Sequence, residues 1–163
     1  MICLARLLVA SALLVVTACA GTMHVPLSST DTKLWSDSAQ HDRDKMVGKW
    51  LGESDSGDGK LRLTLVERRE NGTYTLTFRT YEGHNYEEAV EVGLWGISGP
   101  VYFTIMRGWM TGGRFAPSDT TRAYYYDAYK IIQLDNATFE YQSVETGNRF
   151  VNRRVGDDFQ FSD

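Results

Sequence analysis

The sequence is poor in cysteine, histidine and positive charge, and each shortage argues against one kind of bond, site or partner. Its two cysteines, Cys3 and Cys19, lie near the N-terminus, so the rest of the chain cannot form an internal disulfide. The three histidines, His24, His41 and His84, are isolated and have no spacing that suits a metal ion. The formal net charge of −4 argues against a nucleic-acid partner. We predict no metal site, no cofactor and no nucleic-acid binding.

A catalytic motif is also missing. There is no Gly-x-Ser-x-Gly elbow that would present a nucleophilic serine. The adjacent acids Glu87 and Glu88 point to opposite faces if they lie on a strand, so they cannot act together as a catalytic pair. The acidic cluster of Glu53, Asp55 and Asp58 misses the register of an EF-hand loop and is better explained by a hairpin turn. We therefore predict a protein that is not an enzyme.

No apolar run is long enough for a permanent membrane helix, which needs about 20 residues. An apolar stretch over residues 7–16 follows Arg6, which is the pattern of a secretory signal peptide. The stretch ends in Val16-Thr17-Ala18-Cys19. This tetrad resembles the lipobox of bacterial lipoproteins, in which the cysteine is lipidated and becomes the new N-terminus. The alternative is a plain signal peptide that is cut near Ala18 or Ala20.

The lipobox resemblance implies an anchor and a location. It implies a signal peptide over residues 1–18 and acyl chains on Cys19 that hold the protein on a membrane, where two chains are enough for stable binding. The next residue is Ala20 rather than the aspartate that favours inner-membrane retention in enterobacterial lipoproteins. We therefore expect the outer membrane, with the protein facing the periplasm. Residues 19–44 would form the lipidated N-terminus, a tether and a short helix, and residues 45–163 the folded domain.

From Gly48 onward the sequence has the pattern of an all-β domain. Apolar and polar residues alternate: Leu61 and Leu65 fall on one strand face, and Arg62 and Thr64 fall on the other. We expect each strand to have one packed face and one solvated face. Turn residues separate the predicted strands, which cover 48–54, 60–69, 73–81, 86–98, 101–107, 122–134, 138–145 and 149–155.

The short connections between these strands predict an antiparallel up-and-down order. About eight such strands can close into a barrel, which removes the exposed edges that invite aggregation. A short helix through Gln40 and Asp44, ended by Gly48, is expected to precede the first strand. The predicted fold class is therefore an all-β, antiparallel up-and-down barrel with a short N-terminal helix.

The first predicted strand opens Gly48-Lys49-Trp50, which resembles the Gly-x-Trp motif at the start of the lipocalin barrel. The resemblance implies a small lipocalin-like, or calycin-like, domain over residues 48–155. It also implies that Trp50 lies across the closed end of the barrel, against an arginine of the last strand. Arg153 and Arg154 are both available there, on opposite strand faces, and the sequence does not choose between them.

Aromatic residues make up 12% of the chain and include the candidate ligand contacts. The segment 107–121 is long for a hairpin connection and carries apolar residues that no strand pattern explains, so we expect a lid, a partner-binding edge or a folded-back plug. The leading function is non-catalytic binding of a small apolar or amphiphilic molecule. The alternative is a module with a filled barrel that binds an envelope protein or maintains the envelope. The candidate ligand contacts are Trp95, Tyr102, Trp109 and Phe115.

Overall fold

The computed structural model describes residues 39–56 and 58–162. The expected helix is present over residues 39–46 and leads directly into the first strand. The predicted signal peptide, the Cys19 anchor and the tether fall on residues 1–38 and lie outside the described residues. No helix in the described part of the chain has the length and hydrophobicity that a membrane span requires.

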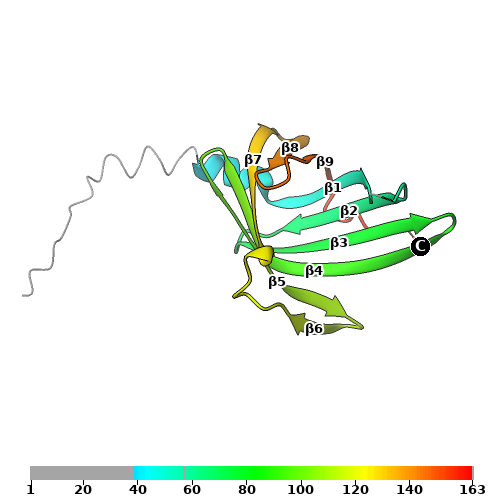
Figure 1. Ribbon diagram of the computed structural model, residues 1–163. Helices are drawn as coiled ribbons and strands as arrows, with labels where there is room; N and C mark the ends of the chain where they lie inside the picture. Colours follow the sequence, from blue (N-terminus) through cyan, green and yellow to red (C-terminus); the bar gives the residue numbers. More distant parts are fainter. Residues whose placement is uncertain (1–38, 57, 163) are drawn as a thin grey trace, which may run out of the picture.

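Nine strands and one 3-10 turn follow the helix (Figure 1). They are β1 (Gly48–Asp55), β2 (Leu61–Arg68), β3 (Thr73–Glu82), β4 (Asn85–Ser98), β5 (Val101–Thr111), β6 (Arg114–Pro117), η1 (Ala123–Tyr125), β7 (Tyr126–Leu134), β8 (Thr138–Ser143) and β9 (Arg149–Val155).

Eight of these strands close into an antiparallel barrel, which confirms the predicted fold class. Their order is β4-β3-β2-β1-β9-β8-β7-β5, and pairing of β4 with β5 completes the circle. β6 pairs with β5 and extends the sheet as a hairpin that projects from the barrel (Figure 1). Tight turns allow this order: Gly72 has a φ of 81°, and Asn71 Oδ1 accepts a hydrogen bond of 3.0 Å from the backbone N–H of Thr73.

The segment 107–121 is not the loop that we expected. β5 continues to Thr111, and the chain turns at Gly112 and Gly113 and returns as β6. Both glycines have positive φ, 55° and 74°, as two-residue hairpin turns require. The predicted strand over 122–134 is also too long, because η1 occupies its first residues and β7 begins at Tyr126.

The two faces of β2 are reversed relative to a simple apolar-inside pattern. Arg62 and Thr64 line the barrel interior, whereas Leu61 is 43% exposed on the outside. The C-terminal segment, residues 156–162, explains the reversal because Phe159 and Phe161 lie beside Leu65 on the outer face.

Polar contacts hold the C-terminal segment in this position. Lys49 Nζ donates a 3.0 Å hydrogen bond to the carbonyl of Phe159, and Arg79 Nη1 donates one of 2.7 Å to the carbonyl of Ser162. The Arg79 guanidinium also lies 5.0 Å from the ring of Phe161. The outer face of β2 and β3 is therefore a second packed surface.

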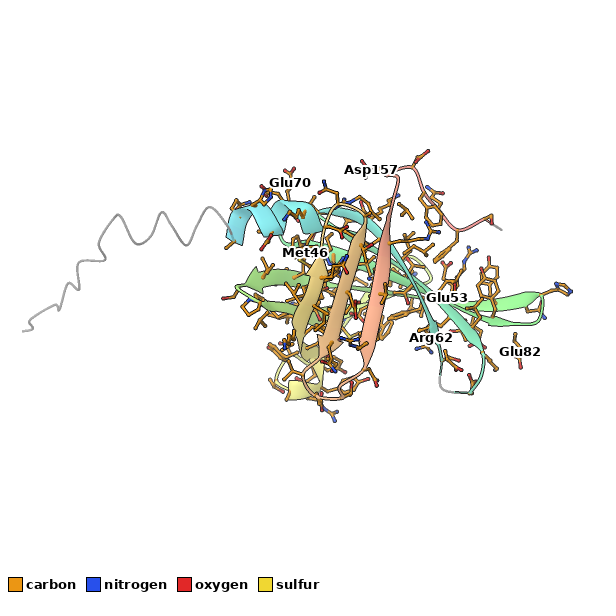
Figure 2. All side chains as sticks on the ribbon, turned by 90° about the horizontal axis from the view of Figure 1, so that it is seen from above. Met46, Glu53, Arg62, Glu70, Glu82 and Asp157 are labelled. Atoms are coloured by element: carbon orange, nitrogen blue, oxygen red, sulfur yellow. The ribbon has the colours of Figure 1, made fainter. Side chains whose placement is uncertain are left out.

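One end of the barrel is closed by the helix and a buried tryptophan. Trp50 is fully buried, and its Nε1 donates a 2.9 Å hydrogen bond to the carbonyl of Met46. The guanidinium of Arg154 lies 4.3 Å from the Trp50 ring, while Arg153 is exposed on the opposite face of β9. Arg154 is therefore the arginine of the closed end. In Figure 2, Met46 marks this end, and Arg62 lies toward the other end of the strands.

Gly48 is required for this arrangement. Its φ is 109°, and a Cβ on it would lie 2.8 Å from Nη1 of Arg154. Arg154 Nη1 donates a 2.8 Å hydrogen bond to the carbonyl of Val47, and Nη2 donates to the carbonyl of Lys45. The glycine thus leaves room for the guanidinium that joins the last strand to the end of the helix.

Candidate functional site

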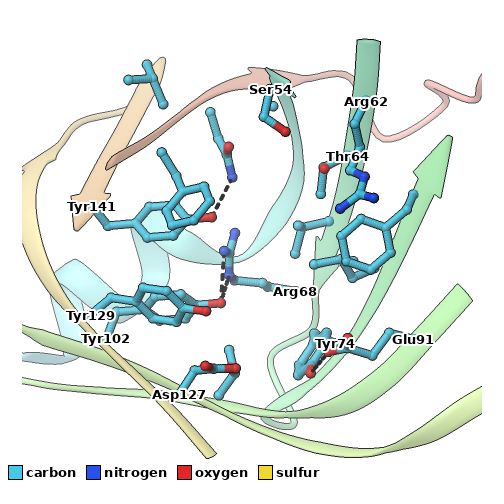
Figure 3. A pocket seen from close by; sticks show the side chains of 18 of the residues that line it. Ser54, Arg62, Thr64, Arg68, Tyr74, Glu91, Tyr102, Asp127, Tyr129 and Tyr141 are labelled. Carbon is cyan, nitrogen blue, oxygen red and sulfur yellow. Dashed lines mark hydrogen bonds between the residues drawn. The ribbon is translucent and has the colours of Figure 1, made fainter. Parts of the chain in front are cut away.

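The barrel interior contains a cavity of about 260 Å³ above the closed end (Figure 3). Pockets that hold drug-sized ligands measure about 300 to 1,000 Å³, so this cavity suits a small molecule. Its wall combines aromatic rings with charged side chains from opposite sides of the barrel. The residues that define its chemistry are Arg68, Tyr74, Glu91, Tyr102, Asp127, Tyr129, Tyr141 and Asn152.

Arg68, at the end of β2, supplies a buried positive charge. Its side chain is only 1% exposed, and its guanidinium lies 4.8 Å from the ring of Tyr102 and 5.2 Å from that of Phe139. Nε and Nη2 donate hydrogen bonds of 3.3 and 3.0 Å to the Tyr102 hydroxyl. Within the part of the chain that the structure describes, no group accepts a hydrogen bond from the buried Nη1. Leaving a buried donor unpaired typically costs about 1 to 3 kcal/mol, and more for a charged group.

Tyrosines from the second half of the barrel form a rigid wall opposite Arg62 and Thr64. The Tyr129 ring stacks on that of Tyr102 at 5.3 Å and meets that of Tyr141 edge-on at 5.1 Å. Burial raises the pKa of Tyr141 to about 12, so its hydroxyl stays protonated. Interlocked rings of this kind keep the shape of the cavity fixed while leaving hydroxyls on its surface.

Two carboxyl groups, Glu91 on β4 and Asp127 on β7, line the same cavity. The hydroxyl of Tyr74 donates a hydrogen bond to Oε1 of Glu91 (Figure 3). Burial raises the pKa of Glu91, the hydrogen bond from Tyr74 lowers it by less, and the nearby charge of Asp127 raises it further. Burial and the charge of Glu145 raise the pKa of Asp127. Ionisation of either group is therefore less favourable in the folded protein than in the unfolded chain.

Glu91→Gln should raise the urea midpoint of unfolding at pH 7. Because the folded-state pKa of Glu91 lies above its unfolded value, ionisation costs the folded state free energy as the pH rises through 4.5, and the full cost applies above the folded-state pKa. The gain from Glu91→Gln should therefore vanish at pH values below 4.5. Urea melts across pH measure this, with Glu87→Gln at an exposed position of the same strand as the control. A gain that does not depend on pH would contradict the assignment.

The mouth of the cavity is formed by a change of register in the β4–β5 pair. Gly93 pairs with Met106, but Val92 pairs with Gly108, so one residue, Arg107, is skipped. Before this bulge the even-numbered residues of β5 face inward; after it, Trp109 faces inward opposite Glu91. A bulge commonly re-aims a side chain in this way.

Trp109 borders an outer hollow of about 490 Å³. Its ring lies 6.4 Å from that of Phe78, and Tyr124 lies on the rim. Glu91 and Asp127 line both this hollow and the inner cavity, whereas Arg68 lines only the inner one. The cavity therefore has a cation at depth and, nearer the mouth, two carboxyl groups, a second cation at Arg62 and an aromatic rim.

The structure brings together two of the four predicted ligand contacts. Tyr102 lines the inner cavity and Trp109 lines its mouth. Trp95 instead belongs to the core of the closed end, where its Nε1 donates a 3.2 Å hydrogen bond to the carbonyl of Arg69. Phe115 is 54% exposed and lies outside the barrel. The sequence does not single out Arg68, Glu91 and Asp127, because polar residues of strands are expected to face solvent.

The fold and its cavity define a lipocalin-like barrel: eight antiparallel strands, one end closed by a helix and a hollow that opens at the other. No family model matches the sequence, and no curated protein matches it. Among solved structures, it is similar to the crystal structure of a lipocalin-like protein from Bacteroides uniformis. The identity is 12% and the TM-score 0.45, and the match covers 68% of this chain and 99% of the other.

Proposed function

We propose that the barrel binds one small amphiphilic molecule in its cavity and catalyses no reaction on it. The observation that carries the proposal is the cavity of about 260 Å³, with aromatic walls and a few fixed polar groups. Aromatic walls provide apolar contact, and convergent polar groups set orientation. A purely apolar ligand would leave Arg68 Nη1 without an acceptor and would cover Glu91 and Asp127 with apolar surface, both at a cost in free energy, so an amphiphile fits better.

A protein-interaction or envelope-maintenance module is the second candidate. It is favoured by the β5–β6 hairpin, on which Met110 and Phe115 are exposed. Exposed apolar side chains that lie close together often mark a protein contact. The hollow interior supports ligand binding over this alternative, which was based on a filled barrel.

Native mass spectrometry of the protein purified from cells should detect a small bound molecule. Thr104→Phe places a ring in the cavity and should weaken binding of that molecule at least tenfold, because the two compete for the same space. Val101→Phe, on the outer face of the same strand, is the matched control and should have no effect. Absence of any bound molecule in the wild type would favour the interaction module.

Ligand entry should also change the fluorescence of Trp109 at the mouth. The response should disappear in Trp109→Phe and persist in Trp95→Phe, because Trp95 lies in the closed-end core. The comparison separates binding in the barrel from binding elsewhere on the surface.

We further propose that Cys19 anchors this barrel to the outer membrane, facing the periplasm. Metabolic labelling with palmitate should mark the wild-type protein, and Cys19→Ser should abolish both the label and cleavage of the signal peptide. Cys3→Ser is the matched control, since this cysteine lies within the predicted signal peptide, and it should keep the label. An unlabelled wild type released by osmotic shock would refute the anchor.

A further inference from the structure

The floor of the cavity holds a permanent positive charge, Arg68, whose buried Nη1 has no hydrogen-bond partner among the described residues. An arginine side chain stays protonated in proteins, so burial does not neutralise it. Two of the Arg68 nitrogens donate hydrogen bonds to Tyr102, and the third, Nη1, has no acceptor in residues 39–56 and 58–162. Within the described residues, no carboxylate forms a salt bridge with Arg68. The rings of Tyr102 and Phe139 stabilise the charge without using the donor.

The two carboxyl groups do not serve as the counter-ion of Arg68. Glu91 and Asp127 lie toward the mouth, where they border the outer hollow that Arg68 does not reach. Their pKa values are raised by burial rather than lowered by the guanidinium. The empty space between Arg68 and the two carboxyl groups is therefore flanked by the Arg68 guanidinium at depth and by acceptors nearer the mouth, where Arg62 also lines the wall.

We infer that the cavity selects a small organic acid whose carboxylate bonds to Arg68 Nη1 and whose hydroxyl or ammonium group, several atoms away, bonds to Glu91 or Asp127. This inference rests on the proposed function and names its ligand class. A charge-assisted hydrogen bond to the guanidinium satisfies the unpaired donor. The rings of Tyr129 and Tyr141 pack against the body of the ligand.

The size and charge of the cavity limit the acid further. A volume of about 260 Å³ is too small to enclose a long acyl chain within the inner cavity. A phosphate dianion would bring a second negative charge toward Glu91 and Asp127, which already disfavour ionisation. A singly charged carboxylate is repelled less by Glu91 and Asp127 than a dianion is. A hydrogen-bond donor on the same molecule can also bond to either of these two carboxyl groups.

Isothermal titration of the full-length protein in detergent at pH 7 tests the inference with four probes. 4-Hydroxyphenylacetate should bind at least tenfold more tightly than its neutral isostere, 4-hydroxyphenethyl alcohol. It should also bind more tightly than phenylacetate, which lacks the donor, and than phenyl phosphate. In Arg68→Met the acid and the alcohol should bind equally. The comparison of probes on the wild type holds even if Arg68→Met fails to fold.

Equal binding of acid and alcohol by the wild type would overturn the inference but leave the proposed function intact. Tighter binding of phenyl phosphate would overturn the choice of carboxylate. If no probe binds while native mass spectrometry finds a neutral molecule in the barrel, the inference is again wrong and the proposed function stands. If no probe binds and no molecule copurifies, both are wrong.

Discussion

Trp50→Ala should lower the free energy of unfolding by about 3 to 5 kcal/mol, the usual cost of truncating a buried tryptophan. The side chain is fully buried, and its ring meets that of Phe139 edge-on at 6.0 Å. The substitution also removes the hydrogen bond to Met46, which ties the helix to the closed end of the barrel. A loss of this size is a large part of the stability of about 5 to 15 kcal/mol that is typical of a domain. Urea melts of the two proteins measure it.

A double-mutant cycle identifies the arginine that stabilises Trp50. Arg154→Ala should show a coupling energy of about 0.5 to 2 kcal/mol with Trp50→Ala, because its guanidinium lies over the ring. Arg153→Ala, at the exposed neighbouring position, is the matched control and should show none. A loss below about 1 kcal/mol for Trp50→Ala would mean that the tryptophan is exposed in solution.

The second large effect is expected at Gly93, where β4 meets the bulge. A Cβ at this position would lie 2.6 Å from the Tyr74 ring and even closer to the carbonyl oxygen of Ile105. The carbonyl belongs to the paired strand and cannot move without disturbing the barrel, and Tyr74 is buried and hydrogen-bonded to Glu91. Gly93→Ala should therefore cost about 3 kcal/mol, at the upper end of overpacking effects.

Gly96→Ala provides the matched control on the same strand. A Cβ at Gly96 would also be crowded, but only by the tip of the Phe103 ring. That side chain is 36% exposed on the outer face and can turn aside. We expect a change within about 0.5 kcal/mol, as for most surface substitutions. Equal losses at Gly93 and Gly96 in urea melts would show that the loss of glycine, rather than the particular neighbour, determines the effect.

The barrel could be predicted from the sequence because its signals are local. The period of two within strands and the turn at Asn71-Gly72 each depend on a few neighbouring residues. The hairpin of β5 and β6 also had such a signal, the pair Gly112-Gly113, and the surrounding apolar residues hid it. Two consecutive glycines between Thr111 and Arg114 are typical of a two-residue hairpin turn, although they are also compatible with a loop.

The site could not be predicted in the same way, because its inner face is set by remote contacts. Arg68 faces the cavity because Leu65 and the residues that share its face pack outward, under Phe159 and Phe161. Those two aromatic residues lie about 90 positions further along the chain, and alternation within β2 cannot reveal them. Two phenylalanines, Phe159 and Phe161, in a C-terminal segment beyond the last predicted strand were the available hint that a second packed surface existed.

The unpaired residue in β5, Arg107, determines which side chains beyond it face the cavity. Deleting one residue between Met106 and Trp109, or adding one, would exchange the two sides of the hairpin beyond that point. Trp109 would turn toward solvent, and Met110 would take its place at the mouth. A substitution at Arg107 changes one surface side chain. An insertion or deletion of one residue instead exchanges the inward and outward faces of all later residues of the hairpin. Related chains that keep this mouth should therefore preserve the number of residues here more strictly than their identities.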